Sequence, residues 1–390
     1  MEKITVGIIY GGRSVEHEVS IISALQTLHA LDKDKYQPLP LYISKQGRWY
    51  TGDDLLDLAN YRNLDTLLAT CRQVIFSPTY DQGQIIFLPK KGIFQKMEYQ
   101  AIDVAFPVIH GTNGEDGCLQ GLLELSGLPY VGPGVLGAAA GMDKIVMKAC
   151  LKEANLPTPD YIWFYSWRWK NDKAAVLREI EEKLTYPLVI KPANLGSSIG
   201  IGRAENDTQL SEAIDLAATF SGRILVELAI TPLREINCSV LGCPESLEVS
   251  VCEEPAAGEG FLSFADKYLE GGGKGMSSLS RRIPADLPKD QQQVILDLAK
   301  KAFIALDGHG VCRIDFLMQA DEGKIYINEV NTIPGSLAFY LWQPLGKDFS
   351  QLTDELIHLA LRRQREKQRL VYTYASNILS KSGLKGAKTK

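Results

Sequence analysis

The spacing of apolar residues over the first third of the chain alternates between strand-like runs and helix-like periodicity. The opening run KITVGIIYGG is almost continuously apolar, and the next segment, SVEHEVSIISALQTLHAL, has the spacing of a helix that we expect Ser14 to cap. The same alternation continues as strands at 36–43 and 101–111, a helix at 55–69, a hairpin at 84–92, and a loop, helix and strand at 114–132. Near-continuous apolar strands that alternate with helices predict an α/β domain over residues 1–132, built on a parallel sheet with both faces covered.

Strands become more frequent along the rest of the chain. In the next segment we expect helices at 144–156, 174–184 and 208–220, and strands at 161–169, 188–192 and 222–230. Beyond it we expect strands at 235–242, 246–253, 310–318 and 324–332, a helix at 289–306 and a closing helix at 349–369. We therefore predict a central unit at 133–234, an α+β unit at 235–372, and a polar, basic and disordered tail at 373–390.

Composition and charge narrow the function classes. The chain has 390 residues, 45% of them hydrophobic, and a formal net charge of −5, which gives no electrostatic footprint for nucleic acid or an anionic membrane. No apolar run is long enough to span a bilayer, and the first residues do not resemble a signal peptide. The seven cysteines are scattered and include no C-x-x-C, so we expect reduced thiols in a cytoplasmic protein and no zinc site. Small-molecule chemistry is the expectation that remains.

Two acidic strands near the C-terminus carry the strongest chemical signal. Arg313 and Asp315 are two residues apart on one strand, and Glu329 and Asn331 are two apart on the next, so each pair projects from one strand face. If the short QADEG turn joins these strands in a hairpin, carboxylates, an amide and a guanidinium converge. Such oxygen ligands suit Mg²⁺ shared with substrate phosphates, whereas the alternative is a salt-bridged sheet surface.

The stretch YPLVIKPANLGSSIGIGRA allows two interpretations. Lys191 ends an apolar strand beside a Gly/Ser loop whose backbone amides can approach phosphate, and Lys144 is a second candidate cation, although no P-loop or dinucleotide motif occurs. Alternatively, GSSIG fits the nucleophile elbow of serine hydrolases with Ser198 as nucleophile, and His309 or His358 as the base. Pro192 breaks the strand and no helix pattern follows the serine, which argues against the hydrolase.

Nine motifs taken together resemble the D-alanine:D-alanine ligases of the ATP-grasp superfamily over about the first 360 residues. In chain order they are GGRSVEHEVS, HGTNGEDGCLQG, GMDK, VIKPANLGSSIG, LVELAI with REI, DKY, RIPADL, CRIDF and INEVNTIPG. The resemblance implies a Rossmann-like N-terminal domain followed along the chain by an ATP-grasp fold. It also implies that the protein uses ATP to join two D-alanines, through an acyl phosphate, into D-alanyl-D-alanine for peptidoglycan synthesis. Whether the protein forms a homodimer is left open.

The resemblance also implies residue roles. The residues implied to bind ATP are Lys144 and Lys191 at the phosphates, Glu227, Leu228, Ala229 and Ile230 at the adenine, Glu235 at the ribose, and Lys267 on a lid at 261–285. The ligands implied for two Mg²⁺ ions, with Mn²⁺ as an alternative, are Asp315, Glu329 and Asn331. The catalytic set is a hydrogen-bonded trio of Glu16, Ser197 and Tyr268, with Arg313 and the Gly335 N–H at the tetrahedral intermediate. The residues implied at the substrates are Val19, His110 and Ser336.

Two segments depart from the family pattern. The lid carries LEGGGKGMSSLSRR, which is longer and richer in glycine than usual, and the chain after NTIPG reads SLAFYLWQPLG. The family usually has a serine for the second substrate's carboxylate there, whereas Tyr340 lies near that position. D-lactate, D-serine or another amino acid therefore stays open as acceptor, and a ligase-like protein that binds ATP without turnover is a further alternative.

Overall fold

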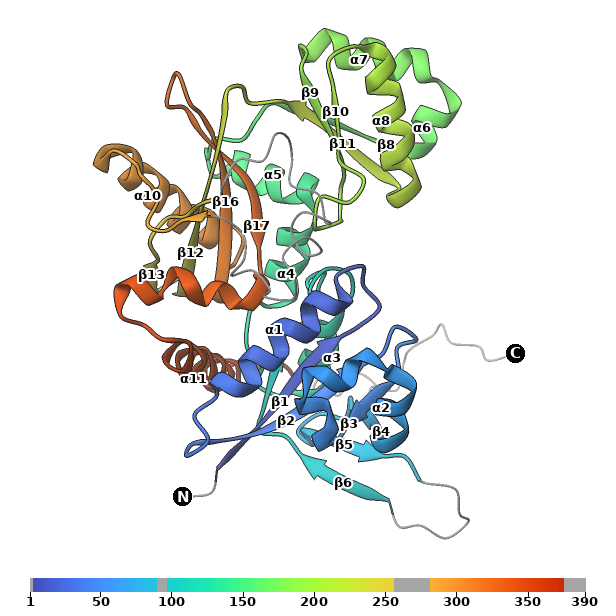
Figure 1. Cartoon of the computed structure of the whole chain (residues 1–390), viewed down its shortest axis with the longest axis vertical. Helices are drawn as coiled ribbons and strands as arrows, with labels where there is room; N and C mark the ends of the chain where they lie inside the picture. Colours follow the sequence, from blue (N-terminus) through green and yellow to red (C-terminus); the bar gives the residue numbers. More distant parts are fainter. Residues whose placement is uncertain (1–2, 90–96, 256–280, 375–390) are drawn as a thin grey trace, which may run out of the picture.

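A computed structural model describes residues 3–89, 97–255 and 281–374 of the chain. Its elements form three units along the long axis of the molecule, and the C-terminal unit lies between the N-terminal and central units (Figure 1). The strand orders are β6-β5-β4-β3-β2-β1-β7 in the N-terminal unit, β10-β9-β11-β8 in the central unit, and β13-β12-β16-β17 in the C-terminal unit, with a small β14-β15 pair beside the last. No helix within these described ranges has the length and apolarity needed to cross a membrane.

The N-terminal sheet has a parallel core. Strand β1 (Ile4–Gly11) lies between β2 (Tyr36–Ile43) and β7 (Val104–Pro107), and both pairings are parallel, as predicted. The remaining strands extend the sheet in antiparallel fashion: β3 (Trp49–Thr51), β4 (Arg72–Phe76), β5 (Gln84–Phe87) and β6 (Glu98–Ala101). The buried residues of α1 (His17–Ala30) and α3 (Cys118–Ser126) belong to separate hydrophobic clusters, so each helix completes a core of its own.

Two local predictions in this unit are wrong. The N-cap of α1 is Glu16 rather than Ser14, whose hydroxyl instead accepts the Glu16 N–H at 3.1 Å. The helix expected at 55–69 is divided into two 3-10 turns, Asp53–Leu56 and Leu58–Arg62, followed by α2 (Leu64–Thr70). The side chains of Asp57 and Asn63 each accept a backbone N–H bond from the helical segment that follows, so a new helical segment begins after each of them.

The central unit is an antiparallel sheet with helices packed on one face. Its strands are β8 (Tyr161–Tyr165), β9 (Leu188–Pro192), β10 (Gly202–Ala204) and β11 (Arg223–Leu228), and its helices are α6 (Ser166–Asn171), α7 (Lys173–Lys183) and α8 (Asp207–Phe220). The strand predicted for 161–169 ends at Tyr165. Trp169 lies in α6, buried in the helix-covered core, with its indole N–H donating to Asp215 at 2.7 Å.

The C-terminal sheet separates an apolar face from a polar face. Its strands are β12 (Leu233–Cys243), β13 (Ser246–Val249), β16 (Gly310–Gln319) and β17 (Ile325–Asn331), next to the short β14 (Glu254–Pro255) and β15 (Arg281–Arg282). Alternate residues such as Ile236, Ile314 and Val330 join a core with α10 (Lys289–Ala305), α4 (Val135–Met142) and α5 (Lys144–Glu153). The intervening residues, Arg313 and Asp315 among them, therefore lie on the opposite face.

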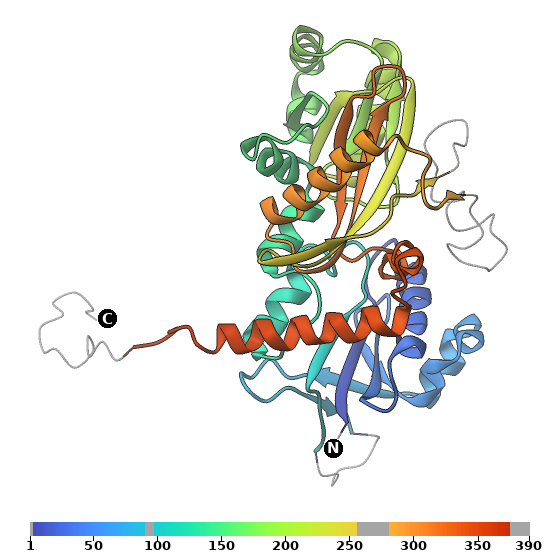
Figure 2. The same ribbon diagram turned by 90° about the vertical axis from the view of Figure 1, so that its left-hand side faces the viewer.

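The end of the chain returns to the N-terminal unit. After β17 come two 3-10 segments, η4 (Gly335–Leu341) and η5 (Gln343–Leu345), and then α11 (Phe349–Lys367). Leu352, Leu356 and Ile357 of α11 share one hydrophobic cluster with Val6 and Ile8 of β1. Figure 2 shows α11 alongside the N-terminal sheet, so the first and last segments form a single core.

Candidate active site

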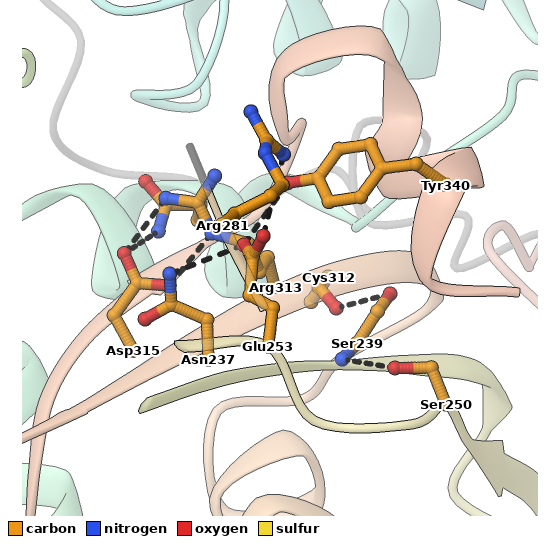
Figure 3. Close-up of polar contacts among 10 residues, drawn as sticks. Asn237, Ser239, Ser250, Glu253, Arg281, Cys312, Arg313, Asp315 and Tyr340 are labelled. Atoms are coloured by element: carbon orange, nitrogen blue, oxygen red, sulfur yellow. Dashed lines mark hydrogen bonds and ion pairs between the residues drawn. The ribbon is translucent and has the colours of Figure 1, made fainter. Parts of the chain in front are cut away.

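The β16-β17 hairpin brings the predicted acidic residues together. Asp315 pairs with Glu329, and Arg313 pairs with Asn331, in an antiparallel register. Arg313 donates from Nε and Nη2 to the two oxygens of Asp315, each at 2.7 Å (Figure 3). Asn331 Nδ2 donates to Asp315 Oδ2 at 3.0 Å. Two carboxylates and an amide thus share one face of the hairpin, a donor set that fits Mg²⁺. Their role as metal ligands stays a prediction.

A buried cluster of charges surrounds Lys191 at the end of β9. Lys191 forms an ion pair with Glu227 and donates to Asn328 Oδ1 at 2.8 Å. Glu227 also pairs with Lys148 of α5 at 2.9 Å, although the side chains of Lys148 and Glu227 are only 0% and 1% exposed. Burial raises the pKa of Glu227, but the two lysines outweigh it and bring that pKa down to about 2. Burial lowers the pKa of Lys148, and the Glu227 carboxylate opposes this effect. With both lysines protonated, two cations and one anion leave the surplus positive charge that a phosphate site requires.

Lys144 joins this cluster to the metal face. Its Nζ donates to the Leu195 carbonyl at 2.7 Å and lies 3.9 Å from Glu329 Oε2. The Lys144 N–H donates to the Ala193 carbonyl at 2.7 Å, which fixes the start of α5 against the Gly/Ser loop. The two predicted phosphate-binding lysines therefore contact neighbouring residues of β17, Asn328 and Glu329, next to the predicted metal ligands.

Glu16 and Ser197 are in direct contact although they are far apart in sequence. The Ser197 hydroxyl donates to Glu16 Oε1, so the N-terminal unit contacts the Gly/Ser loop as the trio predicted. A Cβ at Gly111 or Gly196 would approach Glu16 Oε2 to 2.7 and 2.8 Å respectively and would displace that carboxylate, and Gly111 also has a φ of 73° that favours glycine. Tyr268, the third member of the trio, and Lys267 lie outside the described residues, together with most of the predicted lid.

A chain of hydrogen bonds connects His110 to Ser336. The Ser336 N–H donates to Ser23 Oγ at 3.0 Å, and Ser23 Oγ lies 2.9 Å from His110 Nε2. His110 Nδ1 lies 2.8 Å from the Ile333 carbonyl, which can only accept, so Nδ1 carries the proton. Burial lowers the pKa of His110 to about 4, so the neutral ring accepts the Ser23 hydroxyl proton at Nε2. Val19 lies buried on the same helix as Ser23.

Glu115 ties two loops together below this chain. Its carboxylate accepts the N–H groups of Gly111 and Ile333, each at 2.8 Å, and lies 3.3 Å from the Thr332 hydroxyl. Burial raises the pKa of Glu115 to about 8, and the nearby charge of Glu16 adds to this effect. The HGTNGEDG loop and the segment before Gly335 are therefore joined by a buried carboxyl group.

The segment predicted to line the adenine pocket forms the hinge between β11 and β12. The Leu228 and Ala229 N–H groups donate to the carbonyls of Asp160 and Pro187, each at 3.0 Å. Ile230 continues the hinge, and Glu235 lies in β12 opposite Leu317. The Glu227 side chain is directed to the two buried lysines, which the sequence did not indicate.

The structural context of Ser198 does not match a nucleophile elbow. Such a serine lies on a turn between a strand and a helix. Here β9 ends at Pro192 and the loop leads into strand β10 instead of a helix. The serine hydrolase hypothesis loses its structural basis.

Several residues of the site were missed by sequence reasoning. Lys148 lies one turn after Lys144 on α5, and this i, i+4 spacing was a usable signal. Ser23 and Glu115 gave no signal, because each connects to the segment around Gly335 through a partner more than 200 residues away, Ser336 and Ile333 respectively. Asn328 reaches Lys191 through a β-bulge, since Asp315 pairs with Glu329 whereas Phe316 pairs with Ile327.

Comparisons with known proteins agree with this geometry. Family models described as D-ala D-ala ligase N-terminus and D-ala D-ala ligase C-terminus match residues 5–133 and 150–358. A D-alanine–D-alanine ligase of Thermoanaerobacter sp. is 42% identical over 378 residues, covering 95% of this chain and 99% of that protein. The solved structure of the D-alanine–D-alanine ligase from Coxiella burnetii has a TM-score of 0.78 at 29% identity, covering 94% of this chain and 97% of that one. VanG, a D-Ala:D-Ser ligase from Enterococcus faecalis, also has a TM-score of 0.78, at 30% identity, covering 92% and 100%.

Proposed function

Because this chain belongs to the D-alanine–D-alanine ligase family, we propose that it joins two D-alanines with ATP to form D-alanyl-D-alanine for the cell wall. The observation that carries the proposal is the convergence of Arg313, Asp315, Glu329 and Asn331 beside the buried lysines Lys144, Lys148 and Lys191. It is an ATP-dependent, ADP-forming ligase of the ATP-grasp fold.

Activation of the first D-alanine is assigned to the junction of the three units. The carboxylate of D-alanine attacks the γ-phosphorus of ATP, and the bond from that phosphorus to the β–γ bridging oxygen breaks. ADP departs, and D-alanyl phosphate, an acyl phosphate, remains. Lys144 and Lys191 hold the phosphates, and their positive charges offset the charge that develops there. Divalent metal, which we propose as two Mg²⁺ ions at Asp315, Glu329 and Asn331, supplies further neutralisation of phosphate charge when bound.

Peptide bond formation is assigned to the space above Arg313. The free amine of the second D-alanine adds to the acyl carbonyl, the C–O bond to phosphate breaks, and the surplus proton leaves the nitrogen. Arg313, held by its two bonds to Asp315, and the Gly335 N–H face the oxyanion of the tetrahedral intermediate. Loss of one such donor typically removes about 3–4 kcal/mol of transition-state stabilisation.

The remaining assignments concern substrate identity and location. Glu16, Ser197, Val19, His110 and Ser336 are proposed at the first-substrate site, with Glu227 to Ile230 and Glu235 at the nucleoside. D-serine is the second candidate acceptor, because a D-Ala:D-Ser ligase shares this fold and the segment after Gly335 departs from the family pattern. All seven cysteines are free, which supports a cytoplasmic location. The three-unit division at residues 132 and 234 and a homodimer remain proposals.

The decisive experiment offers ATP, Mg²⁺ and D-alanine with mixed acceptors and identifies the products by mass spectrometry. We expect D-alanyl-D-alanine and equimolar ADP and phosphate. Predominance of a D-alanyl-D-serine product would reassign the acceptor, and nucleotide binding without D-alanine-dependent phosphate release would contradict ligase activity altogether.

A further inference from the structure

A second polar cluster lies on the same sheet face as the predicted metal ligands, and no role has been given to it. At its centre is Glu253, which is 3% exposed. Its Oε1 accepts from Tyr340 OH at 3.1 Å and from Asn237 Nδ2 at 3.2 Å, and its Oε2 lies 3.3 Å from Arg281 Nη1. Figure 3 shows Glu253, Arg281 and Tyr340 directed toward one another beside Arg313.

Strand pairing fixes where this cluster lies relative to the proposed chemistry. Glu253 pairs with Asn237, Asn237 pairs with Asp315, and Asp315 pairs with Glu329, so these residues form one row across the sheet. Directly paired residues in antiparallel strands share a face and are about 5 Å apart. Glu253 is thus roughly 10 Å from Asp315 and roughly 15 Å from Glu329, on the side away from Lys144.

Arg313 lies between the two ends of that row. The lysines and Glu329 are on the β17 side of Arg313, where the phosphates are proposed to lie. Glu253 and Arg281 are on the β12 and β14-β15 side. An acceptor held there can reach the acyl carbonyl above Arg313 without displacing the phosphate, so the position suits the second substrate.

The charges of the cluster match an amino acid. An α-amino acid in solution carries a carboxylate and an ammonium group, and Arg281 and Glu253 offer a guanidinium and a carboxylate side by side. The Arg281 guanidinium lies 4.5 Å from the centre of the Tyr340 ring, which leaves the Tyr340 hydroxyl next to both charges. Burial raises the pKa of Tyr340, with Glu253 adding to the rise, so the hydroxyl stays a neutral donor.

The backbone after Gly335 delivers Tyr340 to this position. Ser336, Leu337 and Ala338 have φ angles of 50°, 52° and 51°, a left-handed turn that non-glycine residues seldom adopt. Buried contacts hold the turn, because Leu337 and Ala338 are buried and the Ser336 N–H is bonded to Ser23. The turn of SLAFY therefore places the Tyr340 side chain beside Glu253 and Arg281.

Resting on the proposed function, we propose that Glu253, Arg281 and Tyr340 bind the acceptor amino acid, with Arg281 and the Tyr340 hydroxyl at its carboxylate and Glu253 at its ammonium group.

Two substitutions test the assignment, Tyr340→Phe and Glu253→Gln, because both nearly keep the shape of the side chain. Activation of the first D-alanine is measured separately, by trapping the acyl phosphate with hydroxylamine, which needs no acceptor site. We expect unchanged hydroxamate formation in both variants and a KM for acceptor D-alanine about 10-fold higher, as for loss of one hydrogen bond to a charged group.

The matched control is Glu254→Gln. Glu254 is the next residue, and it accepts from Arg234 at 2.7 and 2.9 Å, away from the cluster. The KM of Glu254→Gln for acceptor D-alanine should equal that of the unaltered chain. An unchanged acceptor KM in Tyr340→Phe and Glu253→Gln, or a parallel fall of hydroxamate and dipeptide formation, would overturn the assignment. An unaltered chain that makes neither product would contradict the proposed function itself.

Discussion

Removal of Lys148 tests whether a buried side chain controls the charge presented to ATP. Within the described part of the chain Lys148 forms its ion pair with Glu227, and Glu227 in turn pairs with Lys191. In the unaltered cluster, two lysines and one glutamate leave one positive charge for phosphate. In Lys148→Met the charge of Glu227 is fully matched by Lys191, and no surplus remains.

The magnitude follows from the pKa of Glu227. Burial raises that pKa, yet the lysines bring it to about 2 from an ordinary 4.5. This difference corresponds to roughly 3 kcal/mol in favour of the ionised form. Lys191 remains after the substitution, so we expect a loss of about 2 kcal/mol in the free energy of unfolding. That is below the roughly 3–5 kcal/mol found when a buried ion loses its only partner.

Nucleotide binding separates this explanation from a simple loss of stability. Calorimetric titration should show that Lys148→Met weakens ADP binding about tenfold, a difference of about 1.4 kcal/mol, while adenosine binding is unchanged. The double variant Lys148→Met/Glu227→Gln restores one surplus charge and should recover the preference for ADP over adenosine. Lys152→Met, one turn further along α5 and exposed, is the control. Equal weakening of ADP and adenosine, or no recovery in the double variant, would refute the reasoning.

Three further predictions concern the loops around the proposed first-substrate site. Ser197→Ala removes the bond to Glu16 and should lower dipeptide synthesis more than Ser198→Ala; steady-state rates of the two variants give the answer, and the reverse order would contradict the assignment. Ser23→Ala leaves the Ser336 N–H and His110 Nε2 without their shared partner, so thermal unfolding should show a loss of about 1–3 kcal/mol, and an unchanged melting temperature would count against the chain of bonds. Burial raises the pKa of Glu115 from 4.5 to about 8, so its contribution to stability is present in acid and is lost as the pH rises between these two values. Over this pH range the melting temperature of Glu115→Gln should fall less than that of the unaltered chain. Parallel melting curves for the two proteins would contradict the prediction.

Periodicity was sufficient to predict the part of the site that lies on regular strands. The two-residue spacing of Arg313 and Asp315, and of Glu329 and Asn331, placed four side chains on one face, and the hairpin register confirms that geometry. Lys191 was found because Pro192 ends its strand beside a Gly/Ser loop. Their roles in binding and catalysis stay predictions.

The remainder of the site depends on contacts that a linear pattern does not encode. Glu253 reaches the site through an isolated bridge to Asn237, and Tyr340 through a left-handed turn of non-glycine residues. Trp169 looked like part of an aromatic strand, whereas its burial among three helices favours α6. In each case the tertiary environment outweighs the local propensity.

The shared core of β1 and α11 also affects how the chain is made. Val6 and Ile8 leave the ribosome about 340 residues before the helix that completes their cluster, Phe349–Lys367. At about 5–20 residues per second, the roughly 215 residues between the end of the first unit and α11 take about 10–45 s to synthesise. Until then an apolar surface of the first unit stays open to chaperones or to a neighbouring nascent chain, and a message truncated before α11 would yield an aggregation-prone product.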